Sequence, residues 1–284
     1  MLIDTHSHLN FKAYDGDRDE VIKKTREAGV VCIDVGTKYE TSKKAIELAE
    51  KYEGIFASVG MHPFHIKTDL LKLRTDESEG NFTPFGEDFN EEKYKELAKS
   101  KKVVAIGEIG LDYYYRPKGS TKKEQFKQKQ KEVFIQQLDL AKDLNLPVIV
   151  HCRMAFDDVY EILRERSLRG VIHSFTGTIE EVKRFIDLGY YIGINGIIFK
   201  LNIDEAIKGC PLDKILIETD CPYLTPLPAV ALAKERPEGY MRNEPSFVKY
   251  VAEKIAELKG ISFGEIADIT TTNAKRLFGV DQSR

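Results

Sequence analysis

Short apolar runs alternate with helical patterns along almost the whole chain, and this alternation limits the possible folds more than any other feature. The runs are rich in Val and Ile and lack the polar alternation of a half-exposed sheet, which is typical of parallel strands buried on both faces. We predict eight strands: Leu2–His6, Val30–Val35, Ile55–Gly60, Val103–Gly107, Pro147–His151, Gly170–His173, Tyr190–Ile194 and Ile215–Thr219. Eight strands with intervening helices in 284 residues is the count expected of a (β/α)8 TIM barrel of the α/β class.

Helical patterns fill the intervals between these runs. We predict helices over Arg18–Ala28, Thr41–Tyr52, Lys122–Leu144 and Asn243–Leu258. Three residue pairs have the spacing of a capping box, in which a Ser or Thr and a Glu satisfy free backbone amides at a helix start. These pairs are Thr121 with Glu124, Thr178 with Glu181 and Ser262 with Glu265, and each is predicted to open a helix.

A closed barrel fits the positions of the polar residues better than an open, doubly wound sheet. Histidine or carboxylate side chains follow the first, fourth, fifth, sixth and eighth predicted strands. A closed ring brings all of those strand ends together, whereas an open sheet spreads them apart. We therefore predict a single barrel domain over residues 1–284, with loops near 61–90 and 222–242 as walls of a cleft.

Charge and cysteine content narrow the class of protein. The formal net charge of −3 argues against a strongly basic nucleic-acid coat protein, but it is compatible with a nuclease that has a local basic rim. No apolar run approaches the ~20 residues needed to cross a bilayer, and the first residues lack a signal-peptide pattern. The four cysteines form no CxxC pair, although a thiolate role for Cys152 or Cys221 stays an alternative. We expect a cytoplasmic protein, monomeric or weakly oligomeric, that binds no membrane.

Four of the six histidines lie at or just after predicted strand ends: His6, His8, His151 and His173. Residues two apart in an extended segment point the same way, so His6 and His8 can reach one ion. Imidazole and carboxylate together form the ligand set of zinc, manganese and iron, and of two-metal hydrolytic sites. A single such histidine is more often a core residue bonded to backbone, but several at corresponding strand ends favour metal ligands.

Carboxylates complete the predicted metal site and supply its catalytic residues, Glu108 and Asp220. Glu108 lies in an apolar, glycine-flanked run where an unpaired charge is costly, and its two oxygens can bridge two cations. A salt bridge to a buried Arg or Lys is the alternative. Asp220 follows the eighth strand, where it can bind a metal and accept a proton from attacking water. Asp4 and Glu218 lie deeper on the same faces, and we expect them to orient ligand histidines from behind.

Side chains near the cleft mouth are candidates for contacts with substrate. Arg153 can clamp a phosphate through its bidentate fork, with a structural ion pair as the alternative. His62 follows the third strand and is predicted to contact substrate, unless it is a loop histidine bonded to backbone, and the role of His65 is open. Tyr113 and Arg116 belong to a tyrosine- and lysine-rich stretch that offers rings for base stacking and cations for phosphate.

Taken together, the motifs resemble those of the TatD family of metal-dependent deoxyribonucleases, a branch of the amidohydrolase-like barrels. The matching pieces are DTHSHLN, GMHP, GEIGLDYYY, PVIVHCR, IHSFTG, IETDCPYLTP and RNEP, in the family's order. They extend from Leu2 to about Pro245, and the ordered set is far more specific than any one motif.

The resemblance implies two divalent ions, which could be Mg, Mn or Zn, in a TIM barrel. The implied ligands are His6, His8, Glu108, His151, His173 and Asp220. Glu108 would bridge the ions, with His6, His8 and Asp220 on one and with His151 and His173 on the other. The implied activity is phosphodiester hydrolysis, often as a 3′-5′ exodeoxyribonuclease, on DNA that is single-stranded or has frayed ends.

Two alternatives stay open from the residues alone. The same dinuclear site can cleave a small carbonyl substrate such as a cyclic amide or lactone, because barrels of this kind host many chemistries. A binding protein that kept a structural metal is the other alternative. Mixed histidine and carboxylate ligands with room for water argue against a closed structural site.

Overall fold

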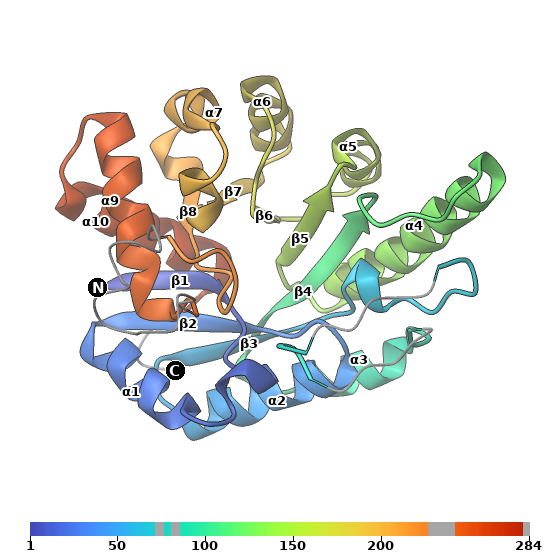
Figure 1. Cartoon of the computed structure of the whole chain (residues 1–284), viewed down its shortest axis with the longest axis horizontal. Coiled ribbons are helices and arrows are strands. Elements are labelled where there is room, and N and C mark those ends of the chain that lie inside the picture. The colour runs from blue at the N-terminus through green and yellow to red at the C-terminus, as the bar shows by residue number, and fades with distance from the viewer. Residues whose placement is uncertain (72–76, 81–85, 227–241, 281–284) are drawn as a thin grey trace.

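The computed structural model describes residues 1–71, 77–80, 86–226 and 242–280. Eight parallel strands are hydrogen-bonded in chain order, with helices around the outside (Figure 1), which confirms the predicted TIM barrel. The strands are β1 (Leu2–Ser7), β2 (Val30–Val35), β3 (Ile55–Val59), β4 (Val103–Asp112), β5 (Val148–Arg153), β6 (Gly170–His173), β7 (Tyr191–Ile194) and β8 (Ile215–Ile217).

The ring is nearly closed, and a few hydrogen bonds join the first strand to the last strand and the residues after it. The Thr5 hydroxyl donates a hydrogen bond to the Ile217 carbonyl oxygen at 3.1 Å. The backbone N–H of Asp220 donates to the carbonyl oxygen of His6 at 2.8 Å. The two ends of the sheet therefore join beside residues predicted to bind metal.

Helices and short 3-10 turns connect the strands. The α-helices are α1 (Arg18–Glu27), α2 (Tyr39–Lys51), α3 (Glu91–Leu97), α4 (Ser120–Asp143), α5 (Phe156–Arg164), α6 (Ile179–Asp187), α7 (Asp204–Gly209), α9 (Val248–Lys259) and α10 (Phe263–Phe278). The 3-10 turns are η1 (Lys12–Tyr14), η2 (Pro63–His65), η3 (Gly196–Phe199), η4 (Leu212–Lys214) and η5 (Pro245–Phe247). Within the described ranges, no helix combines the length and the apolar character needed to cross a membrane.

Helix starts agree with the sequence in two of the three capping boxes. Thr178 and Ser262 each accept a hydrogen bond from the backbone at the third helical position, and the boxes at α6 and α10 are confirmed. The box predicted at Thr121 is wrong, because α4 begins at Ser120, two residues before the predicted start at Lys122, and has no side-chain cap. The helix predicted from Asn243 begins only at Val248, because the Asn243 amide is used to bond the chain after β8.

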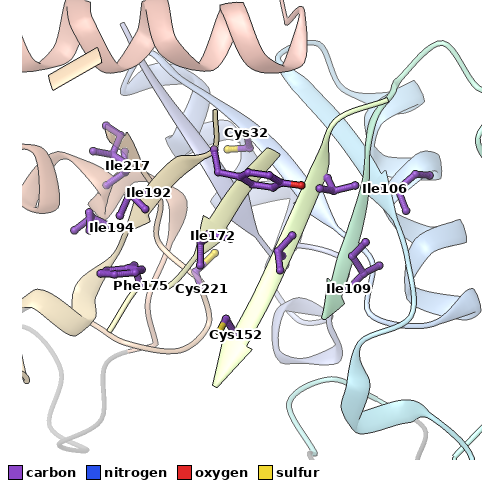
Figure 2. Packing of buried hydrophobic residues seen from close by; sticks show 14 of the residues in the cluster. Cys32, Ile106, Ile109, Cys152, Ile172, Phe175, Ile192, Ile194, Ile217 and Cys221 are labelled. Atoms are coloured by element: carbon purple, nitrogen blue, oxygen red, sulfur yellow. The ribbon is translucent and has the colours of Figure 1, made fainter. Parts of the chain in front are cut away.

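Two groups of buried apolar side chains hold the barrel. The larger group packs the strands against the surrounding helices, and Figure 2 shows part of it, including Ile172, Ile192 and Ile217. The smaller group takes at least one residue from every strand together with the end of α10: Ile3, Val31, Ile33, Val35, Phe56, Val104, Ala105, Ile149, Val171, Tyr191, Leu216, Ala274, Leu277, Phe278 and Val280. His151, His173 and Glu218 lie two residues after members of this smaller group, so these polar side chains leave their strands on the same face.

Strand β4 is longer than predicted, and this changes the position of Glu108. The strand was expected to end at Gly107, but it continues to Asp112 with a register shift against β5 between Ile106 and Ile109. Glu108 therefore lies inside a strand rather than after one. Gly110 permits this course, because its φ of +143° suits glycine and a Cβ there would overlap the carbonyl oxygen of His151.

Candidate metal centre and active site

Six predicted ligand side chains converge at the carboxyl ends of the strands. They are His6 on β1, His8 just after it, Glu108 on β4, His151 on β5, His173 on β6 and Asp220 after β8. Two groups of three have ligand atoms within 4.8 Å of one another: His6, His8 and Glu108, and His6, His173 and Asp220. Segments more than 200 residues apart in the chain thus supply one polar cluster.

The outer nitrogens of two histidines are free to bind a cation. The Nδ1 of His8 lies 2.9 Å from the Val35 carbonyl oxygen, which can only accept, so this nitrogen carries the proton. The Nδ1 of His173 lies 2.9 Å from Glu218 Oε1, in an ion pair behind the ring. Both Nε2 atoms face the cluster, where a bound cation would take the place of any proton that they carry. Nearby carboxylates raise the pKa of both rings, that of His173 to about 10, so the His173 ring is protonated at neutral pH when no cation is bound.

The packing of His6 supports the same conclusion. Its ring stacks on His173 with centroids 3.5 Å apart, and its Nε2 lies 3.1 Å from His8 Nε2. Burial lowers the pKa of His6, so its ring is neutral at neutral pH. Two imidazole nitrogens this close, beside the carboxylates of Glu108 and Asp220, form a donor set that fits a divalent cation.

Glu108 is the centre of the cluster. Its Oε1 lies 2.8 Å from His151 Nδ1, 3.6 Å from His62 Nε2 and 3.8 Å from His173 Nε2, while its Oε2 lies 3.4 Å from His6 Nε2. Burial raises the pKa of this carboxyl, but the surrounding histidines outweigh burial and hold it well below its usual range. Because each oxygen faces different histidines, the carboxylate has the arrangement of a bridging ligand.

Sequence reasoning missed Asp112, which lies four residues after Glu108 on the same strand. Its Oδ2 lies 3.3 Å from His151 Nε2, on the side of the ring away from Glu108. A carboxylate in that place orients the imidazole and sets its tautomer. The alternation of β4 was the available signal, because residues 108, 110 and 112 share one face of an extended strand.

The two carboxylates expected to orient ligands differ in what they contact. Glu218 does contact His173, and its Oε1 also accepts a hydrogen bond from Ser174 N at 2.7 Å. Asp4 contacts the predicted ligand His6 through its backbone. Its carboxyl accepts hydrogen bonds from the backbone of His6 and Thr219 and from the Thr219 hydroxyl, and no contact joins it to an imidazole in the described part of the chain. Burial raises the pKa of Asp4 to about 8 despite these bonds, so it closes the barrel mainly as a protonated acid at neutral pH.

A cavity of about 790 Å³ opens above the cluster. Its lining includes Arg153, whose guanidinium lies 3.8 Å from the centroid of the Tyr114 ring, and Tyr115, which is 36% exposed. The substrate-binding prediction for Tyr113 fails, because this side chain is buried and its hydroxyl donates to Asp158 at 2.7 Å. The next two residues, Tyr114 and Tyr115, line the cavity instead.

Other predicted wall residues fall partly in the cavity. Arg116 is exposed and lies outside the cavity lining in the described residues. From the first predicted wall, His62, His65 and Glu79 line the cavity. From the second, Tyr223 and Leu224 do so, while residues 227–241 lie outside the described residues.

The tautomer of His62 marks it as a hydrogen-bond donor rather than a metal ligand. The backbone N–H of Phe64 donates to its Nδ1 at 3.0 Å, so the proton of the neutral ring sits on Nε2. Burial lowers the pKa of His62 to about 3, which keeps the ring neutral. Its N–H therefore faces Glu108 and the cavity, although the distances alone would also group it with Glu108 and His151 as a ligand.

The cysteines beside the site are not nucleophiles. Cys152 and Cys221 are buried, and burial raises the pKa of each thiol far above neutrality. Both are therefore protonated at neutral pH, when a nucleophile or ligand would have to be a thiolate.

Comparisons with known proteins agree with this geometry. The profile of a family described as TatD related DNase matches residues 3–279. An uncharacterized metal-dependent hydrolase of Bacillus subtilis, YabD, is 41% identical over 99% of this chain and 100% of its own length. A 3′-5′ ssDNA/RNA exonuclease, TatD, of Escherichia fergusonii is 33% identical over 98% of this chain and 99% of its own length.

A solved structure gives the same result. The crystal structure of YJJV, a TatD homologue from Escherichia coli, matches with a TM-score of 0.78 and 30% identity. The match covers 99% of this chain and 98% of that chain. The chain is therefore a metal-dependent hydrolase that belongs to the TatD related DNase family.

Proposed function

We propose that this enzyme is a two-metal phosphodiesterase that removes nucleotides from the 3′ end of single-stranded or frayed DNA. One observation carries the proposal: six side chains that could bind metal, from distant parts of the chain, converge under a cavity whose rim holds a guanidinium over an exposed tyrosine ring. The name of the Escherichia fergusonii relative, a 3′-5′ ssDNA/RNA exonuclease, supports the direction and the single-stranded substrate.

The ligand assignment follows the donor chemistry of the cluster. His6, His8 and Asp220 would hold one ion, His151 and His173 the other, and Glu108 would bridge them. Two divalent ions held there would supply positive charge against the phosphoryl oxygens and ease the loss of a proton from the attacking water. The ions could be Mg, Mn or Zn, because this mixed set of nitrogen and oxygen donors suits several metals.

The remaining steps belong to the chain's own side chains. Asp220, whose side chain is 16% exposed at the cavity floor, accepts the proton of the attacking water. Arg153 binds a non-bridging phosphate oxygen from the rim, where its stacking on Tyr114 fixes the plane of the guanidinium. His62 donates its Nε2 proton in a hydrogen bond to the phosphate or to the leaving 3′ oxygen.

The exposed rings favour a substrate that carries bases. Tyr114 and Tyr115 line the cavity next to Arg153, and both are accessible, at 51% and 36%. Base–aromatic stacking needs an unpaired base, which a single strand or a frayed end supplies. This arrangement supports DNA over a small cyclic amide or lactone, which would use neither the rings nor the guanidinium.

The test is the degradation of a 5′-labelled single-stranded oligonucleotide by metal-stripped protein with added Mg²⁺, Mn²⁺ or Zn²⁺. We expect a ladder of stepwise shortened products that requires metal and is absent with Glu108→Ala. Glu132→Ala, which removes an exposed carboxylate on α4, is the matched control and should leave the ladder intact.

Either clear result decides the proposal. Loss of the label as a single mononucleotide would reverse the direction to 5′-3′. No shortening with any metal, by protein that binds two ions per chain, would refute the nuclease and make hydrolysis of lactones and cyclic amides the next assay.

A further inference from the structure

A short part of the acidic stretch after β3 returns to the mouth of the cavity. The backbone N–H of Ala13 donates to the Ser78 carbonyl oxygen at 2.8 Å, and that of Lys12 donates to the Glu79 carbonyl oxygen at 3.2 Å. These bonds attach residues 77–80 to the loop after β1. Glu77 and Glu79 both line the cavity as a result.

The Glu79 side chain is held in place on several sides. Its Oε1 lies 2.8 Å from His65 Nε2 and 4.0 Å from Lys38 Nζ, and it accepts a hydrogen bond from the Thr37 hydroxyl. The side chain is only 8% exposed. Burial raises the pKa of the carboxyl, but His65, Lys38 and Thr37 outweigh burial and lower it to about 2. Glu79 is therefore a fixed negative charge at neutral pH.

This charge faces a cavity that is cationic in another sector. Arg153 ends β5, and the rings of Tyr114 and Tyr115 belong to the loop after β4, whereas Glu79 lies against the loops after β1, β2 and β3. The cluster around Glu108 lies on the floor between them. The Glu79 side of the cavity lies next to the floor. His65, the partner of Glu79, has its ring centroid 6.4 Å from that of His62, and His62 in turn lies beside Glu108.

We propose that Glu79 determines specificity for the end of the strand, accepting a hydrogen bond from a terminal hydroxyl and excluding a terminal or following phosphate. The inference rests on the proposed exonuclease activity. With the scissile phosphate over the floor, the body of the strand leaves past Arg153, where cation and rings suit phosphates and bases. The nucleoside on the far side then points its free hydroxyl toward Glu79.

The electrostatics explain why this nucleoside must be the last one. A further phosphate beside an ionised, nearly buried carboxylate would be a like-charge contact, which disfavours binding. A hydroxyl has no charge and can donate to a carboxylate oxygen. The same side chain thus favours binding of a strand end and disfavours binding of an internal segment, which makes the cleft an exonuclease site.

The experiment compares two oligonucleotides of one sequence that end in a 3′-hydroxyl or a 3′-phosphate. We expect wild-type kcat/KM to favour the hydroxyl end by at least about tenfold, since the excluded contact is a like-charge pair. Glu79→Gln keeps the shape and most hydrogen bonds but removes the charge, and it should shrink this ratio, mainly through faster cleavage of the phosphate end. Asp88→Asn, an exposed carboxylate of the same stretch paired with Lys67 at 2.8 Å, is the control and should keep the wild-type ratio.

A second measurement uses only the wild-type protein, so it does not depend on whether a variant folds. Titration of the metal-loaded wild type should give tighter binding of a nucleoside 5′-monophosphate than of the 3′,5′-bisphosphate. Equal binding, or an unchanged ratio in active Glu79→Gln protein, would overturn the role of Glu79 and leave the nuclease standing. Absence of cleavage of both oligonucleotides by the wild type with every metal would instead refute the nuclease itself.

Discussion

The floor of the cavity and its walls are built differently. The floor residues lie on strands or within three residues of a strand end, and most are nearly inaccessible, with His6 at 0% and His173 at 3%. The wall residues are also near strand ends, with Arg153 the last residue of β5 and Tyr114 two residues after β4, but their side chains are exposed, that of Tyr114 at 51%. The floor side chains are packed inside the ring, whereas the wall side chains extend into the cavity from its rim. We infer that the floor carries the chemistry and that the walls carry the choice of substrate.

The strongest test of the inference that the floor carries the chemistry is to change a floor residue without changing its size. Asp220→Asn removes the proton acceptor but keeps the size of the side chain, and kcat should fall by about 10²–10⁴-fold. Single-turnover cleavage of the labelled oligonucleotide measures this fall. Asp213→Asn, an exposed aspartate just before β8, is the matched control, and an equal loss there would contradict the assignment.

A wall residue should govern part of the acid stability. The folded-state pKa of Glu79 is about 2, compared with its usual 4.5, so the ionised form stabilises the fold above pH 4.5 and this stabilisation is lost as the pH falls toward 2. The shift corresponds to as much as about 3 kcal/mol. Urea unfolding at pH 6 and pH 3 should show a smaller loss of stability in Glu79→Gln than in wild type. Parallel pH curves would mean that the wall segment is loosely attached.

Asp112 tests how far the floor extends behind the ligands. Asp112→Asn should weaken metal affinity or activity by about 10–100-fold, because the His151 ring loses the carboxylate that orients it. The ratio of cleavage of the two oligonucleotide ends should stay unchanged. Metal titration with a competing chelator gives the affinity, and Asp143→Asn on the exposed face of α4 is the control.

Arg153 tests the opposite assignment, that the wall binds rather than reacts. Arg153→Ala should raise KM by about tenfold through the loss of a charged hydrogen bond, with a smaller change in kcat. Arg153→Lys should recover only part of the binding, because lysine has no planar fork to stack on Tyr114. If kcat instead falls as steeply as in Asp220→Asn, this wall residue belongs to the chemistry.

The smallest expected effect concerns Tyr113, which was predicted to contact substrate but is buried. Tyr113→Phe should lower the free energy of unfolding by about 1 kcal/mol, because the hydroxyl hydrogen bond to Asp158 is lost. Activity should be unchanged. Tyr114→Ala should instead weaken DNA binding with little effect on stability. Chemical denaturation measures the stability of both variants, and a binding titration measures their affinity for DNA.

Strand periodicity predicted the floor well because it depends on local pattern. The apolar runs placed His151 and His173 at strand ends, and the sheet brings those ends together. The same reasoning stopped β4 at Gly107, because the register shift in the strand leaves no mark in apolar periodicity, and the alternation that continues from Glu108 to Asp112 was therefore not used. Asp4 was expected to orient a ligand histidine, and its carboxyl bonds the backbone N–H of His6 as well as Thr219, which lies 215 residues later in the chain.

The walls were harder to predict for a physical reason. The side of the chain on which Tyr113 or Tyr114 lies depends on a turn after Asp112, where strand alternation no longer applies. Glu79 looked like one of many acidic loop residues. Its burial arises from contacts with Thr37 and His65, which only the folded barrel brings to it.

The seam between β1 and β8 also bears on how the protein is made. His6 is synthesised near the start of the chain, but Asp220 and the strand that bonds to β1 emerge more than 200 residues later. Contacts of such long sequence separation form late in folding. A nascent chain still lacking its last strand therefore has histidines without the aspartate, and full metal uptake would report that synthesis has passed β8. The enzyme would thus become active only once the barrel has closed.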